Sequence, residues 1–148
     1  MQANRIGWGR VAITVLLLEV SLVLSAIAWV VMYSYLIHPG EQQAYYERHA
    51  QFASPIVSVV AGIPLLFFAC RWAARGAGNR AVAMSLSIWA VLFLIDMALI
   101  LPAKPTAYLW MMVGISHATK LVAALLGGRA ASIPPHFQHH HSSLAPPR

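Results

Sequence analysis

Long apolar runs separated by short polar segments fill most of the chain. Four runs, residues 11–37, 54–70, 81–101 and 106–127, carry very little charge and are bounded by charged residues, proline or glycine. A transmembrane helix needs about 20 predominantly apolar residues, and such boundary residues are typical of helix ends. The pattern therefore predicts an all-α integral membrane protein, whose transmembrane domain, residues 11–131, is a bundle of four membrane-spanning helices.

The longest polar segment, residues 38–53, lies between the first and second runs. Its sequence His38-Pro39-Gly40 should end the first helix, because proline disfavours helix at the preceding residue and glycine permits a turn. Residues 41–52 then have the pattern of a short helix with aromatic rings mainly on one side. We expect an interfacial helix in this first outer loop, lying along the membrane surface with its rings at headgroup level.

The composition is consistent with lipid as the solvent. The chain of 148 residues is 59% hydrophobic and 9% charged, whereas soluble domains average about 45–50% apolar and about 25% charged residues. The net charge of +6 raises the question of nucleic acid, but the basic residues flank the apolar runs and form no patch with interleaved aromatics. We expect the chain to lie in the lipid bilayer and not to bind nucleic acid. Its candidate binding partners are another protein or a second copy of the chain.

The basic residues predict the orientation, because cytoplasmic loops of membrane proteins carry an excess of lysine and arginine. One side of the membrane would receive seven basic residues and the other only Arg48 and Lys104, while Lys120 falls within a span. We therefore expect both termini in the cytoplasm and the bacterial inner (plasma) membrane as the location. The seven residues are Arg5, Arg10, Arg71, Arg75, Arg80, Arg129 and Arg148.

The two terminal segments flank the predicted transmembrane domain. Residues 1–10 form the expected cytoplasmic N-terminus, and residues 132–148, with four prolines and no apolar period, form an expected disordered tail. Its histidines lack fixed geometry, so no metal site is predicted there. A cleavable signal peptide is the alternative for the first run, with Ala26-Ile27-Ala28 as the cleavage site, but the run exceeds the usual core of about 7–15 residues.

Two opposite charges lie at similar depth in the first and fourth spans. Glu19 and Lys120 are each about eight residues from the inner end of their span, or about 12 Å at 1.5 Å per residue. A charge near mid-membrane costs roughly 2.5–3.5 kcal/mol on insertion scales. We expect Glu19 and Lys120 to pair inside the bundle. The alternatives are that Lys120 snorkels to the inner headgroups, or that the residues form a functional cation site.

Two further polar residues, Asp96 and His117, lie within the third and fourth spans. Asp96 is about five residues from the outer end of its span, and His117 lies somewhat deeper. The carboxylate could bond His117, or reach Lys104 or outer water instead. Intramembrane ionisable groups also mark proton and substrate pathways. A hydrogen-bonded core histidine is the expected role of His117, because no second histidine lies at matching depth to hold a haem.

Small and polar residues line one face of the second and of the fourth span. Such faces are typical of helix–helix contacts in membranes. In the second span, Ser58 and Gly62 form a small-x-x-x-small pair. In the fourth span the face repeats at helical spacing and comprises Val113, Ser116, His117, Lys120, Ala124 and Gly127.

The chain has no phosphate-binding glycine loop, no paired-cysteine metal site and no serine–histidine elbow. We therefore expect that the protein binds no cofactor. Our first hypothesis is that it is a non-enzymatic structural, accessory or interaction protein. An outward-facing membrane enzyme is a further reading, in which the outer-loop residues His38, Glu41 and His49 would converge with Asp96 on one cleft.

A transporter or proton-coupled carrier using Glu19 is the second reading. A lone glutamate in the first of four short helices resembles the arrangement in small multidrug resistance transporters. The resemblance covers residues 12–24 and rests on Glu19 alone. The rest of that family's pattern is absent and this chain is longer, so we infer no membership from it.

Overall fold

The computed structural model describes residues 7–103 and 105–133, most of which are helical and none of which lies in a strand. The predicted tail from residue 134 onwards, its histidines, Arg5 and Lys104 lie outside the described residues. A π turn, η1, extends the first helix, and the 3-10 turns η2 (Gly78–Arg80) and η3 (Leu101–Ala103) adjoin the third. The main elements in order are α1 (Trp8–Met32), η1 (Tyr33–Ile37), α2 (Gln43–Ala73), α3 (Ala81–Ile100) and α4 (Ala107–Ser132).

Four helical segments are long and apolar enough to cross a membrane. They confirm the predicted all-α fold with four candidate spans and indicate a multi-pass membrane protein. The segments are Trp8–Ile37, Gln43–Ala73, Gly78–Ile100 and Ala107–Ser132. Many of their large apolar side chains are exposed, as expected where lipid, rather than protein, covers the helix surface.

The predicted interfacial helix is not a separate element, because α2 runs without a break from Gln43 to Ala73. Its 31 residues correspond to about 46 Å of helix, compared with a hydrocarbon core of about 30 Å. Pro55 lies inside this helix. Proline removes one backbone hydrogen bond, but its fixed φ is compatible with helix. The residues before it include good helix formers such as Gln43 and Glu47, so the helix starts well before the apolar run.

The break between α1 and α2 forms where the sequence predicts it. The π turn η1 ends with the His38 N–H donating to the carbonyl of Tyr33 at 2.9 Å. Gly40 then adopts a φ of 88°, in the left-handed region where a side chain would cause strain. The chain therefore reverses over a few residues and enters α2 directly.

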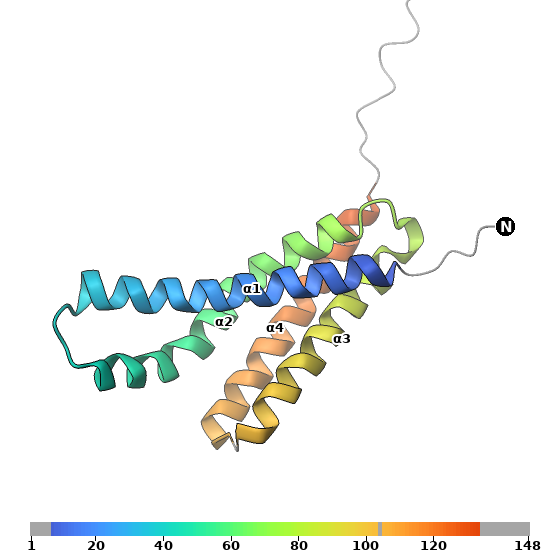
Figure 1. Ribbon diagram of the computed structural model, residues 1–148. Helices are drawn as coiled ribbons and strands as arrows, with labels where there is room; N and C mark the ends of the chain where they lie inside the picture. The colour runs from blue at the N-terminus through green and yellow to red at the C-terminus, as the bar shows by residue number, and fades with distance from the viewer. Residues whose placement is uncertain (1–6, 104, 134–148) are drawn as a thin grey trace, which may run out of the picture.

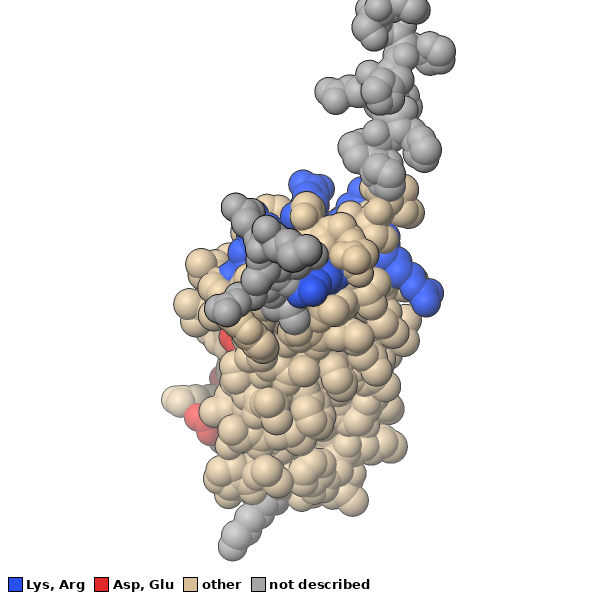
Figure 2. Space-filling model, turned by 90° about the vertical axis from the view of Figure 1, so that its right-hand side faces the viewer, with Lys and Arg blue, Asp and Glu red and all other residues tan. Residues whose placement is uncertain are grey.

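The helices form two hairpins, α1–α2 and α3–α4, which meet at one end and diverge at the other (Figure 1). The most extensive interface joins α2 and α4. Helix α1 begins, α2 ends, α3 begins and α4 ends where the hairpins meet. We call this the basic end, because it carries exposed arginines that gather near one end of the surface in Figure 2. These are Arg10, Arg71, Arg75, Arg80 and Arg129.

Glycine allows close helix packing at the basic end. A Cβ placed at Gly127 would lie 2.6 Å from the carbonyl oxygen of Phe67 in α2, and one at Gly128 would lie 3.0 Å from the Cα of Val82 in α3. Helix α4 therefore approaches the backbones of both neighbours. The surrounding buried core includes Leu66, Cys70, Ala73, Met84, Ile88 and Ala124. We call the opposite end, where η1, η3 and the first turns of α2 and α4 lie, the open end.

Candidate functional site

The face predicted for α4 is its buried face. Five of its six residues, Ser116, His117, Lys120, Ala124 and Gly127, are buried within the bundle, and Val113 is half-buried. This confirms most of the face read from the sequence. Apolar contacts with α2 and α3 surround the basic-end half of this face. The polar half, towards the open end, carries the groups that form the candidate site.

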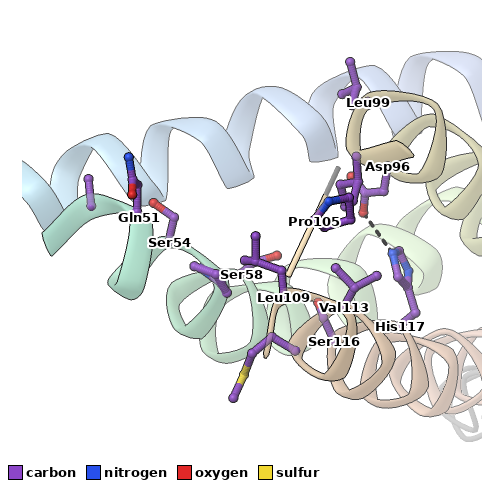
Figure 3. A pocket seen from close by; sticks show the side chains of 14 residues that line it. Gln51, Ser54, Ser58, Asp96, Leu99, Pro105, Leu109, Val113, Ser116 and His117 are labelled. Carbon is purple, nitrogen blue, oxygen red and sulfur yellow. Dashed lines mark ion pairs between the residues drawn. The ribbon is translucent and has the colours of Figure 1, made fainter. Parts of the chain in front are cut away.

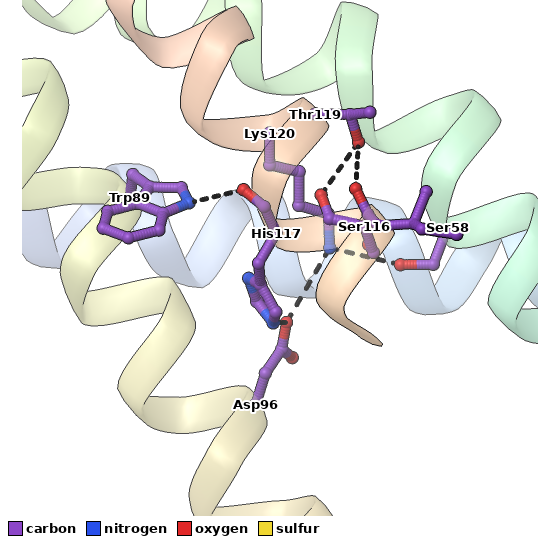
Figure 4. Close-up of polar contacts among 8 residues, drawn as sticks. Ser58, Trp89, Asp96, Ser116, His117, Thr119 and Lys120 are labelled. Carbon is purple, nitrogen blue, oxygen red and sulfur yellow. Dashed lines mark hydrogen bonds and ion pairs between the residues drawn. The ribbon is translucent and has the colours of Figure 1, made fainter. Parts of the chain in front are cut away.

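Lys120 is the most notable of these groups, because its side chain lies inside the protein with 1% exposure. Its Nζ donates a hydrogen bond to the Ser58 Oγ at 3.2 Å and forms an ion pair with the Asp96 Oδ2 at 3.7 Å (Figure 4). The partners come from α2 and α3, so the lysine of α4 links three helices. Because a buried ammonium without a partner costs several kcal/mol, these two contacts allow the lysine to lie inside the bundle.

Asp96 also contacts His117, one of the three partners that the sequence offered for it. The His117 Nε2 lies 3.3 Å from the same Asp96 Oδ2. The imidazole packs edge-on against Phe93, with ring centroids 4.8 Å apart. In addition, the Trp89 Nε1–H donates to the backbone carbonyl of His117 at 3.1 Å. These contacts fix the position of Asp96 relative to α4.

The direction of the side chains explains why Lys120 pairs with Asp96. In an α-helix every Cα–Cβ bond tilts towards the N-terminus. Helix α4 begins at the open end and α3 begins at the basic end. The side chain of Lys120 therefore points towards the open end and that of Asp96 towards the basic end, so they meet although their backbones lie at different depths.

Lys120 does not pair with Glu19, contrary to the expectation from the sequence. Within the described residues, the carboxylate within 4.0 Å of its Nζ belongs to Asp96. Glu19 is partly buried, and its Oε1 is buried without a hydrogen-bond partner in the described part of the chain. Helices α1 and α3 both start at the basic end, so Glu19 and Asp96 tilt in the same direction. Asp96 is about one turn from the end of its helix and therefore lies nearer the open end, towards which the lysine points. Snorkelling of Lys120 is excluded by the same direction and by its burial.

Gly62 makes room for the stem of this lysine. A Cβ at Gly62 would lie 2.7 Å from the Lys120 Cε and 3.7 Å from the Leu22 Cδ2 of α1. The Ser58-x-x-x-Gly62 pair therefore has a more specific role than the close helix contact predicted from its spacing. Gly62 lets the aliphatic stem pass between α2 and α1, and Ser58 accepts a hydrogen bond from the ammonium.

A cavity of about 540 Å³ lies between α2, α3 and α4 on the open-end side of this cluster (Figure 3). Asp96, Ser116, His117 and Ser58 form part of its wall. Lys120 lies behind them rather than in the lining. The apolar part of the wall comprises Pro55, Leu99, Ile100, Pro105, Leu109, Met112 and Val113. The cavity is therefore amphipathic, with one carboxylate among its lining groups.

The polar lining of the cavity offers several hydrogen-bond acceptors beside hydroxyl and amide groups that can also donate. His117 and Lys120 both lie nearest to Oδ2 of Asp96, which leaves Oδ1 for another donor, and the side chain is 21% exposed. The Ser116 Oγ is buried without a hydrogen-bond partner in the described residues. Pro55 has no N–H to donate to the carbonyl of Gln51, four residues before it. Buried polar groups normally have partners, so this lining is suited to a ligand that donates hydrogen bonds.

His49 from the first outer loop lies in a separate aromatic cluster near the open end. Its ring stacks on that of Tyr33, with centroids 3.5 Å apart and planes inclined by 7°. The Trp29 Nε1–H donates to its Nε2 at 3.3 Å. His49 also borders an apolar groove between α1 and α2, which is distinct from the cavity that contains Asp96.

His38 and Glu41 belong to the turn that supports the same cluster. The Tyr46 hydroxyl donates to the carbonyl of His38 at 2.6 Å and accepts from the backbone N–H of Glu41 at 3.1 Å. Neither residue lines the cavity of Asp96. The structure therefore brings Asp96, His117 and Lys120 together, but it places the three outer-loop candidates elsewhere.

Comparisons of the chain with protein-family models, with curated proteins and with solved structures found no match. Within the described residues, no group of three or more histidine, cysteine, aspartate or glutamate side chains is arranged to hold a metal ion. The function of the cluster must therefore be inferred from its geometry alone.

Proposed function

We propose that this protein is a non-enzymatic, multi-pass membrane protein that binds a small amphipathic molecule in the cavity beside Asp96. The observation that carries the proposal is the partly exposed Asp96 carboxylate, which contacts His117 and Lys120 through one oxygen and borders a cavity of about 540 Å³. A cavity of this size with a mostly apolar wall and a few convergent polar groups is typical of small-molecule sites. In this role the protein acts as a binding or accessory protein rather than as a catalyst.

The open end of the bundle faces the outside of a bacterial inner membrane in this proposal. The arginines of the basic end support this orientation, because basic residues are enriched on the cytoplasmic side. The ligand would then enter from the extracytoplasmic side or from the outer leaflet. Both chain termini would lie in the cytoplasm.

The ligand combines an apolar body with at least one strong hydrogen-bond donor. Oδ1 of Asp96 and Oγ of Ser116 are acceptors for the donor group, whereas Leu109 and Met112 contact the apolar part. A primary ammonium group suits a carboxylate best, since hydrogen bonds to charged groups are stronger than neutral ones. An alcohol of the same shape should bind more weakly, and a carboxylate should bind least.

Binding of three matched probes to the protein in lipid nanodiscs tests the proposal. The probes are 4-butylbenzylamine, 4-butylbenzyl alcohol and 4-butylbenzoate, and the measurement is the dependence of the melting temperature on probe concentration. We expect saturable stabilisation by the amine, and a loss of affinity of about tenfold or more for Asp96→Asn, because a charged hydrogen bond is lost. Equal, non-saturable effects of the three probes would reflect partitioning into lipid and would contradict the proposal.

Glu47→Gln is the matched control for this experiment. Glu47 is an exposed carboxylate of α2 that accepts a hydrogen bond from Gln43 at 2.9 Å and does not line the cavity. The substitution removes one negative charge, as Asp96→Asn does. The affinity for the amine should be the same as in the wild-type protein.

A proton-coupled carrier is the second candidate, and the observation that favours it is the buried, unpartnered Oε1 of Glu19. Intramembrane carboxylates are costly and commonly mark proton or substrate pathways. In proteoliposomes, a carrier would move 4-butylbenzylamine in exchange for protons, and Glu19→Gln would abolish the exchange. Binding of the amine without transport would support the binding protein instead.

An outward-facing enzyme is not proposed. That reading requires His38, Glu41, His49 and Asp96 to surround one cleft, and these residues are divided between the aromatic cluster and the cavity.

A further inference from the structure

We infer that Lys120 has two alternative carboxylate partners, and that Glu19 takes the ammonium when a ligand engages Asp96. Glu19 is in this view a positioning residue, which acts on ligand binding through Lys120 rather than by touching the ligand. Only the effect of Glu19 on ligand binding rests on the proposed function. The existence of a second partner for the lysine follows from the bundle itself.

The bundle contains more carboxylates than buried lysine or arginine side chains among the described residues. Asp96 and Glu19 are two carboxylates, whereas Lys120 is the one lysine or arginine that is buried among the described residues. Lys120 is paired with Asp96, and the Oε1 of Glu19 is buried with no partner in the described part of the chain. A buried polar atom normally has a partner, so Glu19 has an unused capacity to accept a donor.

The stem of Lys120 lies beside the face of α1 that carries Glu19. Its Cε is close to Gly62, and Leu22 of α1 borders the same position. Leu22 follows Glu19 by three residues, which places both on one side of α1. Glu19 is also close enough to act electrostatically on Lys120.

Rotation within the lysine stem is sufficient for the exchange. Lysine is a point charge on a flexible four-carbon chain, so its ammonium can turn without movement of α4. The stem already lies on the α1 side, because it occupies the space that the missing side chain of Gly62 leaves. Ser58 accepts from the ammonium in the Asp96-bound position.

The exchange has a direct consequence for binding. A donor group that approaches Asp96 competes with Lys120 for the same carboxylate. If the ammonium had nowhere else to go, binding would leave it buried and unpaired, at a large cost in free energy. Pairing of Lys120 with Glu19 removes this cost. The Asp96 carboxylate is then free to accept the donor group of the ligand.

Melting temperatures of four variants test the second partner without any ligand. We expect Glu19→Gln to lower the melting temperature by no more than about 3 °C in the wild-type background, where Lys120 keeps Asp96. In the Asp96→Asn background the same change should lower it by about 10 °C, since the lysine then loses its last carboxylate. Additive effects of the two substitutions would overturn the inference.

Conservative and compensating changes keep this test decisive. In the Asp96→Asn background, Glu19→Asp retains a carboxylate and should retain most of the stability that Glu19→Gln removes. If the Asp96→Asn, Glu19→Gln protein does not fold, adding Lys120→Met should restore folding, because no cation then needs a partner. Failure of Lys120→Met to restore it would show that the lysine is not the cause, and the inference would be wrong.

The link to the ligand is tested with 4-butylbenzylamine. Glu19→Gln should weaken binding of the amine by about tenfold, Glu47→Gln should not change it, and the infrared carboxylate band of Glu19 should shift when the amine binds. An unchanged affinity and an unchanged band would contradict the exchange. If the wild-type protein does not bind the amine at all, the proposed function fails, while the melting-temperature experiment still decides whether Lys120 has two partners.

Discussion

At the basic end, a Cβ on Gly127 of α4 would lie 2.6 Å from a carbonyl oxygen of α2, whereas at the open end the same two helices enclose part of a cavity of about 540 Å³. Small residues allow the first arrangement, and larger apolar residues mixed with polar ones accompany the second. The polar cluster of Lys120, Asp96 and His117 lies at the boundary between the two regions. The comparison indicates that close packing at the basic end (the closed region) fixes the helices, so that polar groups can line the cavity at the open end (the open region).

The largest effect is expected for Lys120→Met, which removes the cation at the boundary. Asp96 would then be left in the membrane interior without its ion-pair partner, and breaking a buried pair in this way costs about 3–5 kcal/mol. The free energy of unfolding in detergent measures the loss. Arg129→Met, an exposed residue of the same helix, should change the value by no more than about 0.5 kcal/mol.

Combining Lys120→Met with Asp96→Asn sharpens this result. Replacement of both partners of a buried ion pair is often nearly neutral, so the double variant should recover much of the stability lost in Lys120→Met. If the free energy of unfolding of Lys120→Met equals that of the wild-type protein, the Lys120–Asp96 ion pair does not stabilise the contact between the helices.

Truncation of apolar side chains should distinguish the two regions next. Ile88 is fully buried in the closed core, and Ile88→Ala should lower the free energy of unfolding by about 2–5 kcal/mol. Leu109 lines the cavity at the open end, so Leu109→Ala enlarges an existing space and should cost only about 1 kcal/mol. Similar losses for the two variants would indicate that the open region is packed as tightly as the closed one.

Glycine substitutions in α4 should cost less than Lys120→Met or Ile88→Ala. Gly127→Ala would force the α2 and α4 backbones apart, and overpacking of this kind typically costs about 1–3 kcal/mol. Gly114→Ala in the same helix meets no atom within 4 Å and should gain up to about 1 kcal/mol from helix propensity. Equal effects of the two changes would argue against close contact at the basic end.

The sequence was sufficient to predict the four helices and the buried face of α4. Both follow from periodicity and residue size, which are local properties of the chain. The partner of Lys120 could not be derived from depth alone, because depth does not say which helices are neighbours. The tilt of side chains towards helix N-termini was a usable signal, since it directs Lys120 and Asp96 towards each other.

Two other expectations were limited by missing tertiary information. The interfacial helix was placed as a separate element because the second apolar run begins only at residue 54, but α2 continues through this boundary and through Pro55. Gly62 was interpreted as a helix contact, whereas the space it leaves is occupied by the stem of a lysine from α4. The local sequence around Pro55 and Gly62 is compatible with both the expected and the observed arrangement. Packing against the other helices decides which one forms.

Chemical labelling in intact cells tests the contrast between the two regions most directly. Cys70 is the one native cysteine and is fully buried in the closed core, while Val113 lines the cavity one helical turn from His117. A membrane-impermeant methanethiosulfonate reagent carrying a trimethylammonium group, added outside the cells, should label Val113→Cys and leave Cys70 unmodified. 4-Butylbenzylamine should slow the labelling. No labelling of Val113→Cys from outside, or labelling only in inverted vesicles, would contradict an outward-opening cavity above Asp96.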